Sequence, residues 1–196
     1  MALEEIGAPF EPRPVPLDGD AQLAEDYRRI NPMGRVPTLI LPDGTVVTES
    51  LAVLLTLEGR HPEAGLLPAP DDPARAVALR WMALAAGEIY PCVTRSDYPE
   101  RFSADPAHAP AIRERAREMA RGIWRIVERE AAPRPFVLGA RFSLADLYLA
   151  VLSRWMGGED WMPGNCPRVE ALARAVAERP AAGAAWRRHF AVPAGA

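Results

Sequence analysis

A turn, a hairpin and the start of a helix follow one another within residues 31–50. Two β-branched stretches, residues 36–41 and 45–47, flank the turn at residues 42–44, where an Asp-Gly pair suits the positive φ angles of a tight hairpin. Glu49-Ser50 then opens a helical pattern. Because the N-terminus of a helix offers free N–H groups and a positive dipole end to a carboxylate, this stretch predicts a site for a small peptide.

This order of elements resembles the glutathione-binding half of the glutathione S-transferase family. The resemblance is carried by the pattern N-P-x-G-x-V-P at residues 31–37 and by Glu49-Ser50. It implies a cis peptide bond before Pro37, which turns the main chain of Val36 toward the cysteinyl unit of glutathione as a short added strand. It also assigns Ser50 to the α-carboxylate and Glu49 to the ammonium group of the γ-glutamyl unit.

A plainer role is open for each of these residues. Ser50 alone fits a helix N-cap, and Pro37 alone fits an ordinary turn. Their combination at this spacing favours the binding site. Arg35 lies inside the same motif, where it meets either the second carboxylate of glutathione or solvent.

The family pattern starts upstream of the first residues of this chain. Family members begin with a β-strand, a loop that carries the catalytic Ser, Cys or Tyr, and a helix. Residues 1–11 look like the second half of that helix, ended by Gly7 and Pro9. We therefore expect the first strand and the catalytic loop to be missing, and no catalytic residue is named. Met1 is either an internal methionine of a longer protein or the start of a true truncation, which the fold must compensate.

Two domains and a linker are expected. Residues 1–60 alternate helix and strand signals and predict a thioredoxin-like, glutathione-binding domain, with a strand near residues 10–17 and a helix near residues 21–30. Residues 61–73, rich in Pro and Gly, predict a linker. Residues 74–196 show helical periodicity and predict an all-helical C-terminal domain. The expected fold class is thus α/β plus all-α.

Within the helical domain, two long helices are expected on either side of an irregular aromatic segment at residues 90–106. Ser143 and Asp146 form a capping-box pattern. It is similar to the N-capping motif of the family, in which the aspartate supports folding rather than chemistry. Further helices are expected to begin at Pro167 and Pro180.

The resemblance also implies a pocket for an electrophile, lined by the first long helix of the helical domain and the segment after it. The candidate residues in this wall are Tyr90, Arg95 and Tyr98. Tyr90 or Arg95 is able to reach a reacting group from there. For each of them a purely structural role is open as well, as a core aromatic or a solvated arginine.

Composition narrows the chemistry. All 23 basic residues are arginine, which excludes a Schiff-base or phosphate-loop lysine. The net charge of −3, without a dense basic cluster, argues against a nucleic-acid partner. Cys92 and Cys166 show no CxxC or metal-ligand spacing, and we expect no metal. No signal-peptide pattern or apolar run of membrane-span length is seen, so we expect a cytoplasmic protein without a membrane partner.

We expect a glutathione S-transferase-like protein that uses glutathione as co-substrate and conjugates its thiol to a small hydrophobic electrophile, as in detoxification. The resemblance also implies a homodimer. The protein is an enzyme if its natural N-terminus supplies the thiol-activating residue, and a poor catalyst without it. The alternatives are a non-catalytic glutathione-binding or interaction protein on the same scaffold and a purely structural dimer partner.

Overall fold

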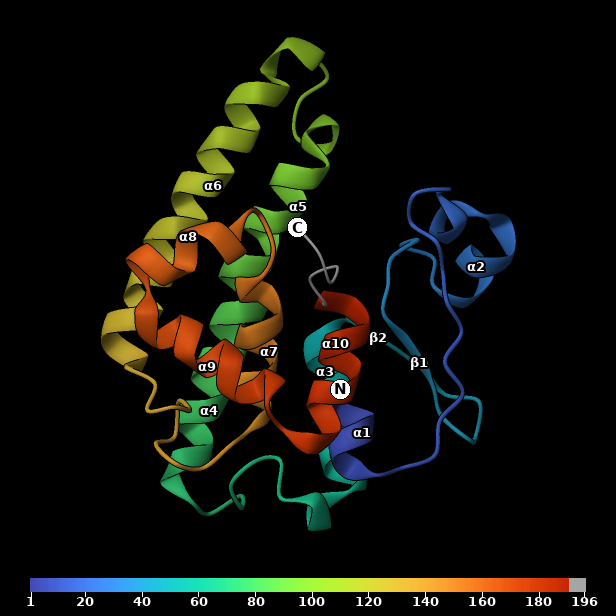
Figure 1. The fold of residues 1–196 in the computed structure, drawn as a ribbon. Coiled ribbons are helices and arrows are strands. Elements are labelled where there is room, and N and C mark those ends of the chain that lie inside the picture. The colour runs from blue at the N-terminus through green and yellow to red at the C-terminus, as the bar shows by residue number, and fades with distance from the viewer. Residues whose placement is uncertain (191–196) are drawn as a thin grey trace.

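The computed structural model describes residues 1–190 and shows a small part with a β-hairpin beside a larger helical part (Figure 1). In chain order, the elements of the small part are α1 (Ala2–Ile6), η1 (Ala21–Leu23), α2 (Glu25–Ile30), β1 (Thr38–Ile40), β2 (Val46–Thr48) and α3 (Ser50–Arg60). The connection contains a short turn of helix, η2 (Pro62–Ala64).

The helical part begins at Pro73. Its elements are α4 (Pro73–Leu84), the π-helix η3 (Ala85–Ile89), α5 (Tyr90–Asp97), η4 (Pro99–Arg101), η5 (Pro106–His108), α6 (Ala109–Ile126), the π-helix η6 (Val127–Ala131), α7 (Leu144–Ser153), α8 (Gly158–Asn165), α9 (Pro167–Ala177) and α10 (Pro180–Phe190). The helix starts expected at Pro167 and Pro180 are confirmed.

The predicted hairpin is confirmed, with shorter strands. β1 and β2 pair antiparallel over three positions, from Thr38 opposite Thr48 to Ile40 opposite Val46. Of the Asp-Gly pair in the turn, only Gly44 has a positive φ, of 85°. Glycine adopts this conformation without a steric penalty, so the turn closes as the sequence indicates.

The strand predicted near residues 10–17 is wrong, because the sheet of the described residues contains only β1 and β2. Pro12, Pro14 and Pro16 stand at alternate positions in this segment. Alternate residues of an extended chain point their N–H groups to the same side, so three prolines leave one edge without donors.

The core of the molecule is built around α7, all of whose residues except Val151 are buried. It packs against α4 and α9. Trp81 and Met82 of α4 and Leu172 of α9 are fully buried in this cluster. A helix that is apolar on nearly every side is stable only when other elements surround it. The central position of α7 therefore explains why residues 144–152 are mostly apolar.

The predicted capping box at the start of α7 is confirmed. The Asp146 carboxylate accepts hydrogen bonds from the Ser143 N–H and the Val137 N–H, both at 2.7 Å, and from the Ser143 hydroxyl at 2.9 Å. The side chain is fully buried. Asp146 therefore joins the loop before α7 to the helix itself and lies outside any cavity described below.

The irregular segment predicted for residues 90–106 begins only after Asp97, because α4, η3 and α5 form one helical run, Pro73–Asp97. This part of the prediction is wrong. Pro91 lacks the N–H that would bond the carbonyl four residues earlier, and the π-turn η3 immediately before α5 accommodates it.

Contrary to expectation, this run also reaches the length and mean hydropathy, 1.2, at which a helix is able to cross a membrane. Of its most apolar stretch, 39% is buried within the structure, and the run packs against α6 and α7. Length and composition alone are weak grounds for a membrane span.

The connection between the two parts is packed into the molecule. Leu66 and Leu67 are buried, and the Leu66 carbonyl accepts a hydrogen bond of 2.9 Å from the Leu144 N–H. Arg75 of α4 forms an ion pair of 2.9 Å with Glu58 of α3. These contacts hold α3, and with it the hairpin, against the helical part.

The two ends of the described chain also meet. Figure 1 shows α1 beside α10, and the two helices are in contact. Glu5 forms an ion pair of 2.6 Å with Arg179 and accepts a hydrogen bond of 3.0 Å from the Ala182 N–H at the start of α10. A carboxylate at that position therefore satisfies a free N–H group of the first turn of α10. Its negative charge interacts favourably with the positive end of the helix dipole.

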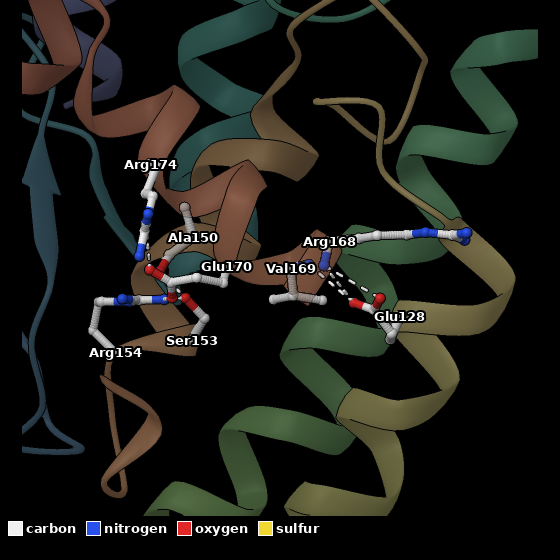
Figure 2. Close-up of polar contacts among 8 residues, drawn as sticks. All are labelled: Glu128, Ala150, Ser153, Arg154, Arg168, Val169, Glu170 and Arg174. Atoms are coloured by element: carbon white, nitrogen blue, oxygen red, sulfur yellow. Dashed lines mark hydrogen bonds and ion pairs between the residues drawn. The ribbon is translucent and has the colours of Figure 1, made fainter. Parts of the chain in front are cut away.

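A similar cap fastens α9. Figure 2 shows Glu128 of η6 accepting hydrogen bonds from the N–H groups of Arg168, at 3.0 Å, and Val169, at 3.1 Å. Both donors belong to the first turn of α9, where N–H groups have no partner within the helix. The contact ties η6 to the N-terminus of α9.

We predict that Asp146 makes the stability of the fold depend on pH. Burial raises the pKa of Asp146 from 3.8 to about 6, although the hydrogen bonds from Val137 and Ser143 act in the opposite direction. Because the folded state then binds the proton more tightly than the unfolded state, the contribution of Asp146 to the free energy of unfolding falls as the pH rises from about 4 to about 6. The fall amounts to at most about 3 kcal/mol.

Urea unfolding of the wild type and of Asp146→Asn across this range measures the effect. The free energy of unfolding of the wild type, minus that of the variant, should fall between about pH 4 and about pH 6 and then stay constant. A difference that is constant throughout, or that rises, would contradict the prediction.

Candidate functional site

A cavity of about 730 Å³ lies between the small part and the helical part, within the size range of small-molecule sites. One wall comes from the loop before β1 and the start of α3. The opposite wall comes from α5, the segment after it, Tyr148 in the middle of α7, and the turn that follows α7. The cavity is lined by all seven residues that the sequence singled out, namely Val36, Pro37, Glu49, Ser50, Tyr90, Arg95 and Tyr98.

The Val36–Pro37 peptide bond is cis, as the resemblance implies. Val36 is half-buried, Pro37 is exposed, and both lie at the cavity. Within residues 1–190, neither the N–H nor the carbonyl of Val36 forms a main-chain hydrogen bond, since the pairing of β1 begins only at Thr38. This main-chain unit is therefore available to a ligand.

Two side chains that the sequence analysis did not single out hold this loop in place. Tyr27 of α2 donates a hydrogen bond of 2.7 Å to the Arg35 carbonyl and lies 2.8 Å from the Thr38 hydroxyl. Asn31, which is 2% exposed, donates to the same carbonyl at 2.7 Å. The side-chain Oδ1 of Asn31 accepts a hydrogen bond of 3.1 Å from the Met33 N–H. Asn31 belongs to the recognised motif, but its role as a buried amide is visible only in the structure.

The start of α3 has an unusual backbone. Glu49 has φ 65° and ψ 120°, a conformation that residues other than glycine rarely adopt. Strain of this kind, about 1–3 kcal/mol, is typical of binding sites. Ser50 is the first residue of α3 and does not cap it, so the plain N-cap role is wrong. Ser50 and Leu51 line the cavity and bring the N-terminus of α3 to it.

Two tyrosines of the helical wall approach this N-terminus. Burial, together with the nearby Tyr90, raises the pKa of Tyr148 to about 12, while the Ser50 hydroxyl acts in the opposite direction. Burial also raises the pKa of Tyr90, reinforced by Glu49 and opposed by Arg35. Both hydroxyls are therefore protonated at neutral pH and act as hydrogen-bond donors. Tyr148 lies inside the long apolar pattern of α7, which hid it from sequence analysis.

An ion-pair cluster supports the end of this wall (Figure 2). Arg154 donates to Glu170 of α9 at 2.5 Å, and Arg174 donates to the same carboxylate at 2.9 Å. Burial opposes the charge of Glu170, but the hydrogen bonds from the two arginines prevail and lower its pKa. Arg154 immediately precedes Trp155 and Met156, which line the cavity. The cluster thus fixes the segment that carries them.

The far end of the same wall is aromatic and basic. The guanidinium carbon of Arg95 lies 5.3 Å from the centre of the Phe102 ring, and that of Arg101 lies 4.0 Å from the centre of the Tyr98 ring. All four residues line the cavity. Cys92, on the same helix, is fully buried outside the cavity, and burial raises the pKa of its thiol.

The geometry suits an extended ligand. One wall offers an unpaired main-chain unit, a carboxylate and a helix N-terminus, which match a peptide backbone, an ammonium group and a carboxylate. The other wall offers hydroxyl donors, aromatic faces and arginines. Within residues 1–190 no group of three or more His, Cys, Asp or Glu side chains is arranged to hold a metal ion.

Comparison with known proteins agrees with this arrangement. Residues 1–60 match the family model of the glutathione S-transferase N-terminal domain, and residues 110–190 match that of the C-terminal domain. An uncharacterized GST-like protein of Escherichia coli K12, YncG, is 27% identical over 164 residues. That alignment covers 84% of this chain and 78% of the relative.

Solved structures extend the likeness to the whole fold. A glutathione transferase homologue from Sulfitobacter, determined with bound glutathione, is 30% identical with a TM-score of 0.88, over 95% of this chain and 89% of that chain. A sphingomonad glutathione S-transferase complexed with glutathione is 31% identical with a TM-score of 0.77, over 95% and 90% of the two chains.

These matches confirm the expected fold class, a small thioredoxin-like part with a two-stranded sheet and helices, followed by a helical part. Both solved proteins are at least 30% identical to this chain, which spans about nine tenths of each. The chain therefore belongs to the glutathione S-transferase family.

Proposed function

We propose that this protein binds glutathione and conjugates its thiol to a small electrophile. The observation that carries the proposal is the convergence, on one cavity, of the unpaired main chain of Val36 and the N-terminus of α3. The solved relatives from Sulfitobacter and a sphingomonad, which share this fold, were determined with glutathione.

Each wall residue has a proposed role. The N–H and carbonyl of Val36 pair with the cysteinyl unit, as an added strand would. Ser50 and the α3 N-terminus bind the γ-glutamyl carboxylate, and Glu49 binds the adjacent ammonium group. Arg35, which also lines the cavity, binds the second carboxylate of glutathione. Pro37 places Val36 at the cavity.

The reaction then takes place between the two walls. The glutathione thiol loses its proton to solvent, its sulfur forms a bond to an electrophilic carbon, and the leaving group departs with the bonding electrons. Holding both reactants in one cavity supplies part of the acceleration. Tyr90, on the facing wall, supplies a hydrogen bond that stabilises the thiolate, and Arg95 and Tyr98 line the half that receives the electrophile.

A non-catalytic glutathione-binding protein is the second candidate. Neither cysteine lines the cavity, so no cysteine thiol of the described residues is available to take part in the chemistry there. Measuring both glutathione binding and consumption of the electrophile separates the two functions, because only an enzyme consumes the electrophile.

We also propose a homodimer located in the cytoplasm. Support for the dimer comes from large exposed apolar side chains in the small part, which a partner chain would cover. These are Phe10, Leu17, Leu23, Ile30, Met33, Ile40 and Val46. Both cysteines are free and buried, which suits a reducing compartment. Light scattering coupled to gel filtration measures the oligomeric state.

Ser50→Ala tests the proposed carboxylate site. Calorimetric titration of the wild type with glutathione should show binding, and loss of a hydrogen bond to a charged group should weaken it by about 10-fold or more. Ser103→Ala is the matched control, because Ser103 bonds His108 away from the cavity, and its affinity should not change. Absence of heat from the wild type at millimolar glutathione would refute the proposed function.

Asn31→Ala tests whether the loop that carries Val36 is held in place by its neighbours. Removing the amide leaves the Arg35 carbonyl with a single donor, so affinity for glutathione should fall several-fold. Amide hydrogen exchange at residues 33–38 should speed up while α7 stays protected. In the control, Asn165→Ala, an exposed amide that bonds a carbonyl at 2.9 Å is removed from α8. If both variants keep wild-type affinity and exchange, Asn31 does not position the loop.

A further inference from the structure

The electrophile half of the cavity contains two arginines without acidic partners. Arg95 and Arg101, here called the arginine pair, belong to the helical wall of the cavity. Arg35 belongs to the opposite wall, here called the peptide wall, which the loop before β1 and the start of α3 form. Within residues 1–190 neither member of the pair forms a salt bridge, whereas Arg154 and Arg179 each meet a buried glutamate. Two uncompensated positive charges at a cavity favour an anionic ligand.

The aromatic neighbours of the pair prepare it for such a ligand. Arg95 lies over Phe102 and Arg101 over Tyr98, at 5.3 and 4.0 Å. A guanidinium held over a ring face keeps N–H donors at its edge, and these match the two oxygens of a carboxylate. Phe102 lines the cavity and is 47% exposed, so the apolar part of a ligand can pack against its ring.

The acidic groups at the cavity do not neutralise the pair. Glu49 lies on the peptide wall, where it is the proposed partner of the glutathione ammonium group. Asp97 lines the cavity, but the charges that act most strongly on it are Arg113 and Arg117 of α6. The arginine pair is left to the second substrate.

We propose that the electrophile of this protein carries a carboxylate on an aromatic or conjugated frame, and that the arginine pair binds this carboxylate. The inference rests on the proposed glutathione function and replaces the small hydrophobic electrophile by an anionic one. With a chloronitrobenzoate, the glutathione sulfur forms the bond to the ring carbon, chloride leaves with the bonding electrons, and the thiol proton passes to solvent. The carboxylate does not react; it orients the ring toward the sulfur.

Binding of two synthetic glutathione conjugates tests the inference without any need for turnover. One is S-(4-carboxy-2-nitrophenyl)glutathione, and the other is its carboxamide, which has nearly the same shape and no charge on the ring. Calorimetry with the wild type should show a preference of about 10-fold or more for the carboxylate, and added salt should reduce that preference.

The double variant Arg95→Gln/Arg101→Gln should bind both conjugates about equally, with unchanged affinity for glutathione itself. Its control is Arg115→Gln/Arg129→Gln, which removes two exposed arginines that pair with surface glutamates, and which should keep the preference. Arg101→Gln alone, at an exposed position, should lose part of the preference and replaces the double variant if that fails to fold.

The outcomes separate the two proposals. Equal affinity of the wild type for the two conjugates, or a preference that survives loss of the arginine pair, overturns the anionic electrophile while glutathione binding stands. Failure of glutathione and of both conjugates to bind overturns the proposed function, and the inference falls with it.

Discussion

The main-chain hydrogen bond from Leu144 to Leu66 joins the two parts of the molecule at the point where the buried helix α7 begins. Asp146 holds the same turn from inside. Arg75 and Glu58 add an ion pair between partly buried side chains, which is stronger than one in full solvent. Since the cavity is formed by one wall from each part, its width depends on this junction. A change there would alter ligand binding without touching any residue that meets the ligand.

The π-turn η3 determines which side chains the helical wall presents. A π-turn contains one residue more than an α-turn, so everything after it is rotated by about 100° around the helix. Tyr90, Arg95 and Tyr98 follow η3 and line the cavity. Pro91 has no N–H for an α-helical hydrogen bond, and the π-turn before it accommodates this loss. The side chains that this wall presents therefore depend on the π-turn as well as on the sequence.

Local patterns were sufficient to predict much of the fold. The hairpin, the start of α3 and the capping box at Ser143 depend on residues within a few positions of one another, and the structure contains all three. The strand expected near residues 10–17 is absent because Pro12, Pro14 and Pro16 remove alternate N–H donors from this segment. Tyr148, Trp155 and the loop contacts of Tyr27 were not predictable, since long-range packing brings them to the cavity. The roles assigned to Val36, Glu49 and Ser50 remain predictions, although their positions agree with them.

The alternating prolines of residues 12–16 also bear on how this protein avoids assembly into fibrils. Residues 10–17, which contain these prolines, are exposed except for the half-buried Val15, and they include the apolar side chains of Phe10 and Leu17. An extended, apolar, exposed stretch is ordinarily a template on which other chains assemble into fibrils. Along one side of this stretch an incoming strand meets carbonyl groups and no donors, so a continuous ladder cannot propagate from that side. The sequence thus carries apolar surface in an extended segment while one route to amyloid-like growth is closed.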